Sequence, residues 1–250
     1  MTTIETLLER GKRFDSNISE LRGKYSGRVF LVGNGPSLNE TPLEQLYEQG
    51  EYTFAMNNIS RIFPKTTWRP SFYFAVSSNL KVKARRKYFI EPSHLNIPCF
   101  IERGWQGTYP DRPNVYWIYC PYMKGKEEDG NPALWSQDCG IITGRHATSM
   151  YSVMQIAVYL GFTELYLIGC DLGYKGFNRG EPDPSHFDTN YWEGLLPFTD
   201  EGAERENNNM LRAHTYAKGM LDHLGITVKN ATVGGELEVY ERIDIDELLS

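Results

Sequence analysis

The sequence predicts an α/β protein with a mostly parallel sheet, and three observations support this. Short apolar runs end in glycine or in small polar residues, as is typical of strands buried on both faces. Segments with helical spacing of apolar residues lie between several of these runs. A glycine-rich turn at residues 33–37 follows the first run, in the place where such sheets bind ligands. Together these features favour a Rossmann-like, three-layer domain with a loop-rich lid.

The N-terminal residues are expected to form a separate helix. Apolar residues at helical spacing predict a helix over about residues 4–25. We therefore divide the chain into an N-terminal helix, residues 1–26, and a single Rossmann-like domain, residues 27–250. Between residues 120 and 140, glycine, proline and charged residues crowd together with little periodicity, which predicts the lid.

The glycine-rich turn has the sequence GNGPS and follows the apolar strand of residues 29–32. A strand, a tight turn and a helix in this order present backbone N–H groups to a phosphate. Thr41 and Pro42 predict the helix start, with Pro42 at the first helical position. The turn lacks the third glycine of a dinucleotide fingerprint and the Gly-Lys-Ser/Thr of a P-loop.

Polar side chains follow the next two predicted strands. Residues 52–56 end at Asn57, and residues 71–76 end at Ser77. Because the ends of parallel strands lie along one edge, these side chains are expected to converge on one crevice. Two further strands are predicted at residues 98–101 and 115–119. The basic run that follows Ser77 is read as a solvated helix face.

The second half of the chain has clear helix boundaries. Thr148 and Ser149 cap a helix with regular apolar spacing, and Gly161 ends it. Arg145 lies in the loop before this helix. A strand at residues 164–169 is then closed by an acidic residue, Asp171. Three segments complete the prediction: an irregular, aromatic stretch at residues 173–194, a helix over about 204–224 and a last inner strand at 226–228.

Composition excludes several classes of protein. The formal net charge of −6 argues against a general nucleic-acid-binding surface. No apolar stretch approaches the roughly 20 residues that span a bilayer, and the N-terminus lacks a signal-peptide core. The four cysteines are scattered without CxxC spacing, which favours reduced thiols in a cytoplasmic protein.

His186 is the best candidate for acid–base chemistry. It lies in a loop rich in functional side chains, and an imidazole titrates near neutral pH. Asp183 or Asp188 could orient it. His146 and His214 are rivals, although the spacing of His214 fits a structural position on a helix face.

Other chemistries lack their usual motifs. The sequence contains no HExxH, no Asp-x-Asp and no paired Cys/His spacing, so we infer no dedicated metal site. It contains no GxSxG elbow and no cysteine in an electropositive setting. Hydrolysis through a covalent nucleophile is therefore disfavoured.

Three segments resemble known glycosyltransferases. Residues 33–38 (GNGPSL) and 148–171 are similar to bacterial family-42 sialyltransferases. They are equally similar to a domain shared by motility-associated flagellin glycosyltransferases and an archaeal 6-hydroxymethylpterin diphosphokinase. Residues 229–237 (KNATVGGEL) and the tail that follows resemble this second group in particular. The similarity covers most of residues 28–249 and is patchy from 81 to 140.

The resemblance implies roles for individual residues. In the sialyltransferases, the Asn-Gly-Pro-Ser loop holds the phosphate and ribose of the donor. An Asn at the end of one strand corresponds to Asn57, and an Asn at the end of another strand aligns nearest to Ser77. Their conserved Arg aligns with His146, next to Arg145, and their catalytic His corresponds to His186. The expected donor-binding residues are Asn34, Gly35, Pro36, Ser37, Asn57, Ser77, Arg145, Thr148, Ser149, Asp171 and Tyr174.

The resemblance favours a metal-independent, inverting glycosyltransferase without a cofactor. The expected donor is a CMP-sugar, a nonulosonic acid above all, and the acceptor is a hydroxyl group of a glycan or another molecule. One alternative is pyrophosphate transfer from ATP to a pterin alcohol, in which Asp171, Asp183 and Asp188 could hold Mg²⁺. Another is a non-catalytic nucleotide-binding module. The sequence leaves a homo-oligomer open.

Overall fold

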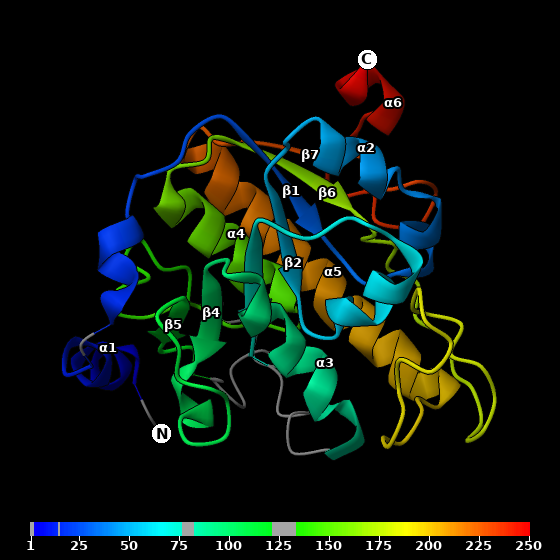
Figure 1. Ribbon diagram of the computed structural model, residues 1–250, viewed down its shortest axis with the longest axis horizontal. Coiled ribbons are helices and arrows are strands. Elements are labelled where there is room, and N and C mark those ends of the chain that lie inside the picture. Colours follow the sequence, from blue (N-terminus) through cyan, green and yellow to red (C-terminus); the bar gives the residue numbers. More distant parts are fainter. Residues whose placement is uncertain (1–2, 15, 77–82, 122–133) are drawn as a thin grey trace.

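The computed structural model describes residues 3–14, 16–76, 83–121 and 134–250. An eight-stranded sheet crosses the molecule in the order β5-β4-β3-β2-β1-β6-β7-β8 (Figure 1). Every neighbouring pair of strands is parallel. The strands are β1 Arg28–Val32, β2 Thr53–Met56, β3 Phe72–Ala75, β4 Cys99–Glu102, β5 Val115–Ile118, β6 Glu164–Ile168, β7 Thr227–Asn230 and β8 Glu241–Arg242. The predicted α/β fold with a parallel sheet is confirmed.

Helices cover both faces of this sheet and complete three layers. The α-helices are α1 Ile4–Lys12, α2 Leu43–Glu48, α3 Arg86–Ile90, α4 Ser149–Leu160, α5 Asp200–His223 and α6 Ile245–Leu249. Side chains alternate along β1, so that Val29 and Leu31 pack with α4 and α5 in one core. Phe30 and Val32 pack in the other core, with α2, α3 and α6.

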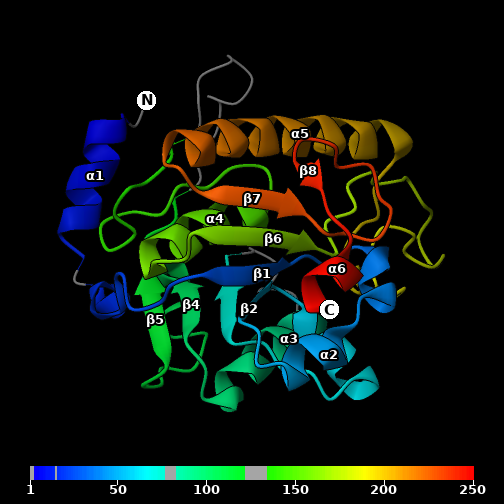
Figure 2. The same cartoon turned by 90° about the horizontal axis from the view of Figure 1, so that it is seen from above.

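The strand order reverses between β1 and β6. β1 pairs with β2 on one side and with β6 on the other, so the chain runs outward from β1 in both directions. Ligands of such sheets bind where the order reverses, beyond the carboxyl ends of the strands. Figure 2 shows the arrowheads of β1, β6 and β7 pointing toward the yellow segment that precedes α5.

The expected N-terminal helix is broken. α1 ends at Lys12, and a separate 3-10 helix follows at Asn17–Leu21. The Ser16 hydroxyl donates to the carbonyl of Trp117, and Ile18 is fully buried in the main core. The packing of this second piece against the sheet therefore overrides the helical periodicity.

Three other boundaries differ from the prediction. The glycine-rich turn enters a 3-10 helix, Pro36–Glu40, so α2 begins only at Leu43, after Pro42. α5 begins at Asp200, where the Thr199 hydroxyl caps it. β7 is followed by a short parallel edge strand, β8, that has no counterpart in the prediction. The predicted lid lies largely at residues 122–133, outside the described residues.

Candidate active site

A cavity of about 280 Å³ lies at the carboxyl ends of β1, β2 and β6. It is therefore at the carboxyl edge of the sheet, as predicted, and at the reversal of the strand order. Seven of the expected donor-binding residues line it together with His186: Asn34, Gly35, Asn57, Thr148, Ser149, Asp171 and Tyr174. The expected convergence of the polar strand ends is confirmed for β1 and β2. Ser77, which follows β3, lies outside the described residues.

The glycine-rich turn packs directly on the end of β6. The Gly35 N–H donates to the carbonyl of Gly169 at 2.9 Å. A Cβ at Gly35 would lie 1.8 Å from Oδ2 of Asp171. The backbone N–H and hydroxyl of Ser37 both donate to this carboxylate, at 3.1 and 2.7 Å. The missing side chain of Gly35 thus leaves space for the Asp171 carboxylate, and the hydrogen bonds from Ser37 hold that carboxylate in place.

Asp171 is a carboxylate with opposing influences on its pKa. Burial raises the pKa above its ordinary value, although the two hydrogen bonds from Ser37 act to lower it. Its position in the cavity wall suits it to accept hydrogen bonds from ligand hydroxyl groups.

Two asparagines present amide oxygens at the strand ends. Asn34 donates through Nδ2 to the carbonyl of Met56, and Asn57 donates to the hydroxyl of Ser149 at 3.1 Å. The Oδ1 atom of each is buried and has no hydrogen-bond partner among the described residues. An unpaired buried acceptor carries a free-energy penalty, which a hydrogen bond from a polar ligand would remove.

The N-terminus of α4 belongs to the same wall of the cavity, where Ser149 accepts a hydrogen bond from Asn57. Thr148 accepts a hydrogen bond from the N–H of Met150 and so caps the helix, and Gly161 ends it in the left-handed conformation. Both predicted ends of this helix are confirmed. Thr148, Ser149 and Met150 all line the cavity. The dipole of a 12-residue helix favours an anion at this end.

His186 is held from three directions. Its Nδ1 lies 2.8 Å from Oδ2 of Asp183, and its Nε2 lies 3.3 Å from the hydroxyl of Tyr174. The imidazole stacks on the ring of Tyr191, with centroids 3.9 Å apart and planes at 6°. Asp183 is almost fully buried, and its other oxygen accepts from the Ser185 N–H. Of the two expected orienting carboxylates, Asp183 performs this role.

The pair of Asp183 and His186 determines which nitrogen can accept a proton. An ionised carboxylate only accepts hydrogen bonds, so the proton of the neutral imidazole is on Nδ1. Nε2 then carries a lone pair directed toward Tyr174 and the cavity. Burial raises the pKa of Tyr174, which therefore stays a neutral hydrogen-bond donor. The arrangement can remove a proton from a hydroxyl group bound in the cavity.

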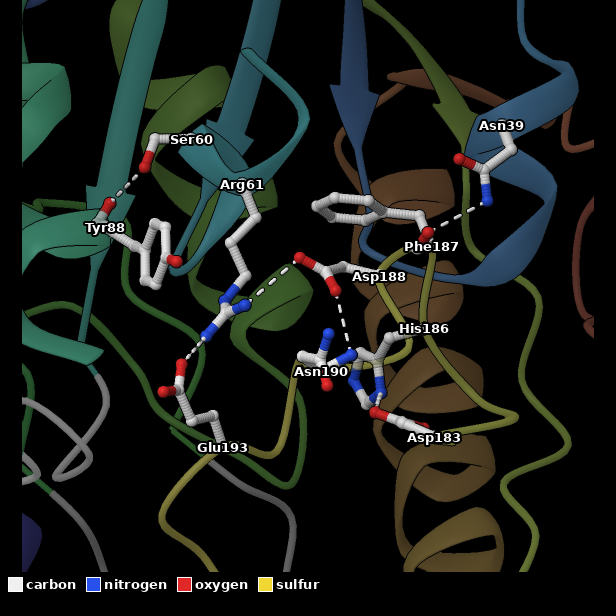
Figure 3. A network of polar contacts seen from close by, with 10 residues as sticks. All are labelled: Asn39, Ser60, Arg61, Tyr88, Asp183, His186, Phe187, Asp188, Asn190 and Glu193. Carbon is white, nitrogen blue, oxygen red and sulfur yellow. Dashed lines mark hydrogen bonds and ion pairs between the residues drawn. The ribbon is translucent and has the colours of Figure 1, made fainter. Parts of the chain in front are cut away.

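Asp188 has a different partner, Arg61, that the sequence analysis missed. Figure 3 shows Arg61 between Asp188 and Glu193. The chain around Arg61 carries no local sign of this role, because its partners are 127 and 132 residues away.

One face of α5 was also missed as a wall of the cavity. Glu206, Met210 and His214 line it at intervals of four residues. His214 was expected to be structural, and its Nδ1 indeed lies 2.9 Å from the hydroxyl of Tyr240. Burial lowers its pKa to about 4, so it is neutral at physiological pH.

Other expected site residues do not face the cavity. Pro36 and Ser37 lie behind its wall, and Ser37 acts through Asp171. Arg145 is half-buried and close enough to Glu102 to oppose the rise in pKa that burial causes there. The Nδ1 of His146 accepts from the Ala147 N–H, and its ring packs edge-on against Tyr151.

The carboxylates proposed for Mg²⁺ do not converge. Asp171 is bonded to Ser37, Asp183 to His186 and Asp188 to Arg61. Within residues 3–14, 16–76, 83–121 and 134–250, no three His, Cys, Asp or Glu side chains form a cluster suited to a metal ion. In the same ranges, no helix is long and apolar enough to span a membrane.

The cysteines are poor nucleophiles. All four are unpaired: Cys99, Cys120, Cys139 and Cys170. Burial raises the pKa of Cys99, Cys120 and Cys139 to about 12.

Comparison with known proteins relates the fold to glycosyltransferases. The MAf glycosyltransferase from Magnetospirillum magneticum AMB-1 superposes with a TM-score of 0.55 at 16% identity, over 95% of this chain and 38% of that one. The likeness is one of fold. This chain thus spans less than half the length of that protein. The expected resemblance to glycosyltransferases is confirmed at the level of the fold.

A second solved structure is more distant. The sialyltransferase CstII from Campylobacter jejuni, in complex with a substrate analogue, cytidine-5'-monophosphate, gives a TM-score of 0.46 at 16% identity, over 86% of this chain and 84% of that one. At this score it adds nothing to the first likeness. No protein-family model matches the chain. No curated protein matches it either.

Proposed function

We propose that this chain is a glycosyltransferase domain that moves a sugar from a nucleotide donor to a hydroxyl acceptor. The observation that carries the proposal is the buried pair of Asp183 and His186, because His186 lines a cavity at the reversal of the strand order. This places a base beside the part of the sheet where α/β proteins bind nucleotides. The fold shared with a glycosyltransferase supports the same conclusion.

We propose that the donor is a sugar linked to a nucleoside monophosphate, namely a CMP-linked nonulosonic acid. The N-terminus of α4, with Thr148 and Ser149, binds the phosphate. When the donor binds, the hydroxyl of Tyr174 turns from Nε2 of His186 to the phosphate, and this leaves Nε2 able to accept a proton. Asn34, Asn57 and Asp171 offer oxygens that accept hydrogen bonds from the ribose hydroxyls and the base. No metal ion is needed to neutralise a monophosphate bound in this way.

The reaction is a single displacement with inversion. The bond from the anomeric carbon to the phosphate oxygen breaks through an oxocarbenium-like state, and its electron pair leaves with the nucleoside monophosphate. The acceptor oxygen bonds to the anomeric carbon and loses its proton to Nε2 of His186. Asp183 stabilises the imidazolium that forms. The helix N-terminus and Tyr174 stabilise the charge that develops on the phosphate.

The two alternatives make different predictions. Pyrophosphate transfer from ATP would draw on the carboxylates Asp171, Asp183 and Asp188, and their separate partners give this reaction no support. A non-catalytic module would bind a nucleotide without turnover.

The test is a thermal-shift screen of nucleotides followed by a transfer assay. CMP should raise the melting temperature more than UMP, AMP or ATP at the same concentration, because the nucleotide that binds most tightly stabilises the folded state most. A ligand at 100 times its Kd adds about 2.7 kcal/mol to the free energy of unfolding. Transfer from CMP-linked sugars to glycan acceptors should continue in EDTA. Binding without transfer would favour the non-catalytic module. ATP-dependent activity that EDTA abolishes and Mg²⁺ restores would favour the diphosphokinase.

A further inference from the structure

A buried arginine joins the segment that carries His186 to the body of the domain. Arg61 lies in the 3-10 helix Ile59–Lys65, which follows β2. It donates to Oδ2 of Asp188 at 3.1 Å and to Oε2 of Glu193 at 2.8 Å (Figure 3). Its side chain is only 3% exposed, and the guanidinium lies 3.9 Å from the ring centroid of Tyr88. The residue is thus fixed on its own side as well.

The two carboxylates lie at the two ends of one turn, residues 188–193. The Tyr191 N–H donates to the carbonyl of Asp188, and the Glu193 N–H donates to that of Asn190. Arg61 therefore holds both ends of the turn at once. Neither end belongs to a helix or strand, so few backbone contacts would replace these ion pairs.

The turn presents the ring of Tyr191 to the face of the imidazole. These rings are nearly parallel and in contact, at 6° and 3.9 Å between centroids. Asp183 fixes the edge of the imidazole at Nδ1, whereas Tyr191 fixes its plane. The direction of the Nε2 lone pair depends on both. A shift of the turn would tilt the base while leaving its hydrogen bond to Asp183 in place.

We propose that Arg61 is a positioning residue that sets the plane of His186 through Asp188, Glu193 and Tyr191. Arg61 does not line the cavity, so its effect on the reaction is indirect. The planar guanidinium is suited to this role because it binds two carboxylates and stacks on Tyr88 at the same time. The kinetic consequence rests on the proposed function, whereas the structural consequence does not.

Kinetics give the first test. In Arg61→Met, kcat for transfer from a CMP-sugar should fall about 10²-fold, the cost of displacing a catalytic group by about 1 Å. The KM for the donor and the Kd for CMP should stay within a few fold, because the phosphate wall is untouched. Arg61→Lys keeps the charge without the fork and should lie between the parent and Arg61→Met.

Hydrogen exchange gives a second test that needs no substrate. Arg61→Met should speed exchange of the amides in residues 183–193 and leave those of β1 and β6 unchanged. Asp188→Asn is a gentler variant, since its amide oxygen still accepts from the Asn190 N–H that Oδ1 of Asp188 now binds. Its effect should exceed that of Glu193→Gln, because the Asp188 side chain is 19% exposed and that of Glu193 is 49%. Combining Arg61→Met with Asp188→Asn should add little to either alone.

The outcomes separate this inference from the proposed function. Exchange that rises throughout the protein would overturn it, because Arg61 would then be a general stabilising residue. Unchanged kcat in a folded Arg61→Met or Asp188→Asn variant would overturn it too. If the parent protein transfers no sugar, the proposed function fails. Selective exchange in residues 183–193 would then still support the positioning of the turn, and unchanged exchange there would refute it.

Discussion

The two sides of the cavity are built in different ways. The strand-end wall, formed by residues 33–35, 57, 148–150 and 169–171, lies directly at the ends of β1, β2 and β6 and at the start of α4. Its backbone continues the pairing of β1 with β6, as in the bond from the Gly33 N–H to the carbonyl of Ile168. The His segment, residues 173–198, contains no helix or strand in its described length. Side-chain contacts hold it, among them the Arg61 ion pairs and the bond between Asp183 and His186, and a backbone bond from the Phe187 N–H to the carbonyl of Asn34 joins it to the glycine-rich turn.

This difference suggests that the two sides have different functions. A wall defined by strand ends and a helix terminus is rigid, so it suits the binding of an invariant group such as a nucleotide phosphate. A segment tied down by a few side chains opens at lower free energy, so it can admit and release an acceptor. Changes in the strand-end wall should therefore affect nucleotide affinity. Changes in the His segment should affect turnover.

The largest effect is expected at His186. His186→Ala should lower turnover about 10²–10⁴-fold, the usual cost of losing a positioned base, and keep the Kd for CMP within a few fold. His186→Asn separates catalysis from loop anchoring, since Asn can still hydrogen-bond to Asp183. Transfer kinetics and CMP titration of both variants make the measurement. Near-parental turnover in His186→Asn would mean that His186 is not the base.

The next effect tests the orientation of the base. In Asp183→Asn, the amide oxygen can keep the bond from the Ser185 N–H, which turns the NH₂ group toward Nδ1 of His186. Nδ1 must then accept, so the proton moves to Nε2 and the base is blocked. Turnover should fall about 10²-fold at unchanged CMP affinity. Full activity of a folded Asp183→Asn variant would show that Asp183 does not orient a base.

Sequence reasoning worked best where the signal was local. Thr148 and Gly161 bound α4 through capping chemistry that can be identified in a few adjacent residues, and the strand ends followed from short apolar runs. Thr199 followed by Asp200 is a capping signal of the same kind, and it was overlooked at the start of α5.

Features that depend on tertiary packing could not be found in this way. Arg61 sits in an ordinary stretch of sequence, and only the fold brings its carboxylates to it. β8 has two residues, too few for any periodicity. The choice between Asp183 and Asp188 as the partner of His186 also needed the folded loop, since both lie within three residues of it.

A smaller effect is expected in the strand-end wall. Gly35→Ala would place a Cβ 1.8 Å from Oδ2 of Asp171 and force the carboxylate off Ser37. CMP affinity should fall about tenfold, equivalent to about 1.4 kcal/mol, and Gly35→Val should lose more. Ser37→Ala is the matched control, because it removes one hydrogen bond to Asp171 without a clash and should cost less. Isothermal titration with CMP measures the affinity of each variant. If folded Gly35→Val binds CMP as tightly as the parent, the glycine-rich turn does not contribute to nucleotide binding.

The smallest effect on CMP affinity is expected when one of two helix-capping threonines is changed. The hydroxyls of Thr148 and Thr199 both accept an N–H in the first turn of their helices, but only Thr148 lines the cavity. Changing either to alanine should lower the free energy of unfolding by about 1 kcal/mol, measured in urea. Because Thr148 accepts through its oxygen, its hydroxyl proton remains available to a phosphate, and a net hydrogen bond is worth about 1 kcal/mol. Thr148→Ala should therefore bind CMP about fivefold more weakly, whereas Thr199→Ala should bind it like the parent. An equal loss in both variants would mean that affinity follows overall stability, and no loss in either would remove the N-terminus of α4 from the phosphate site.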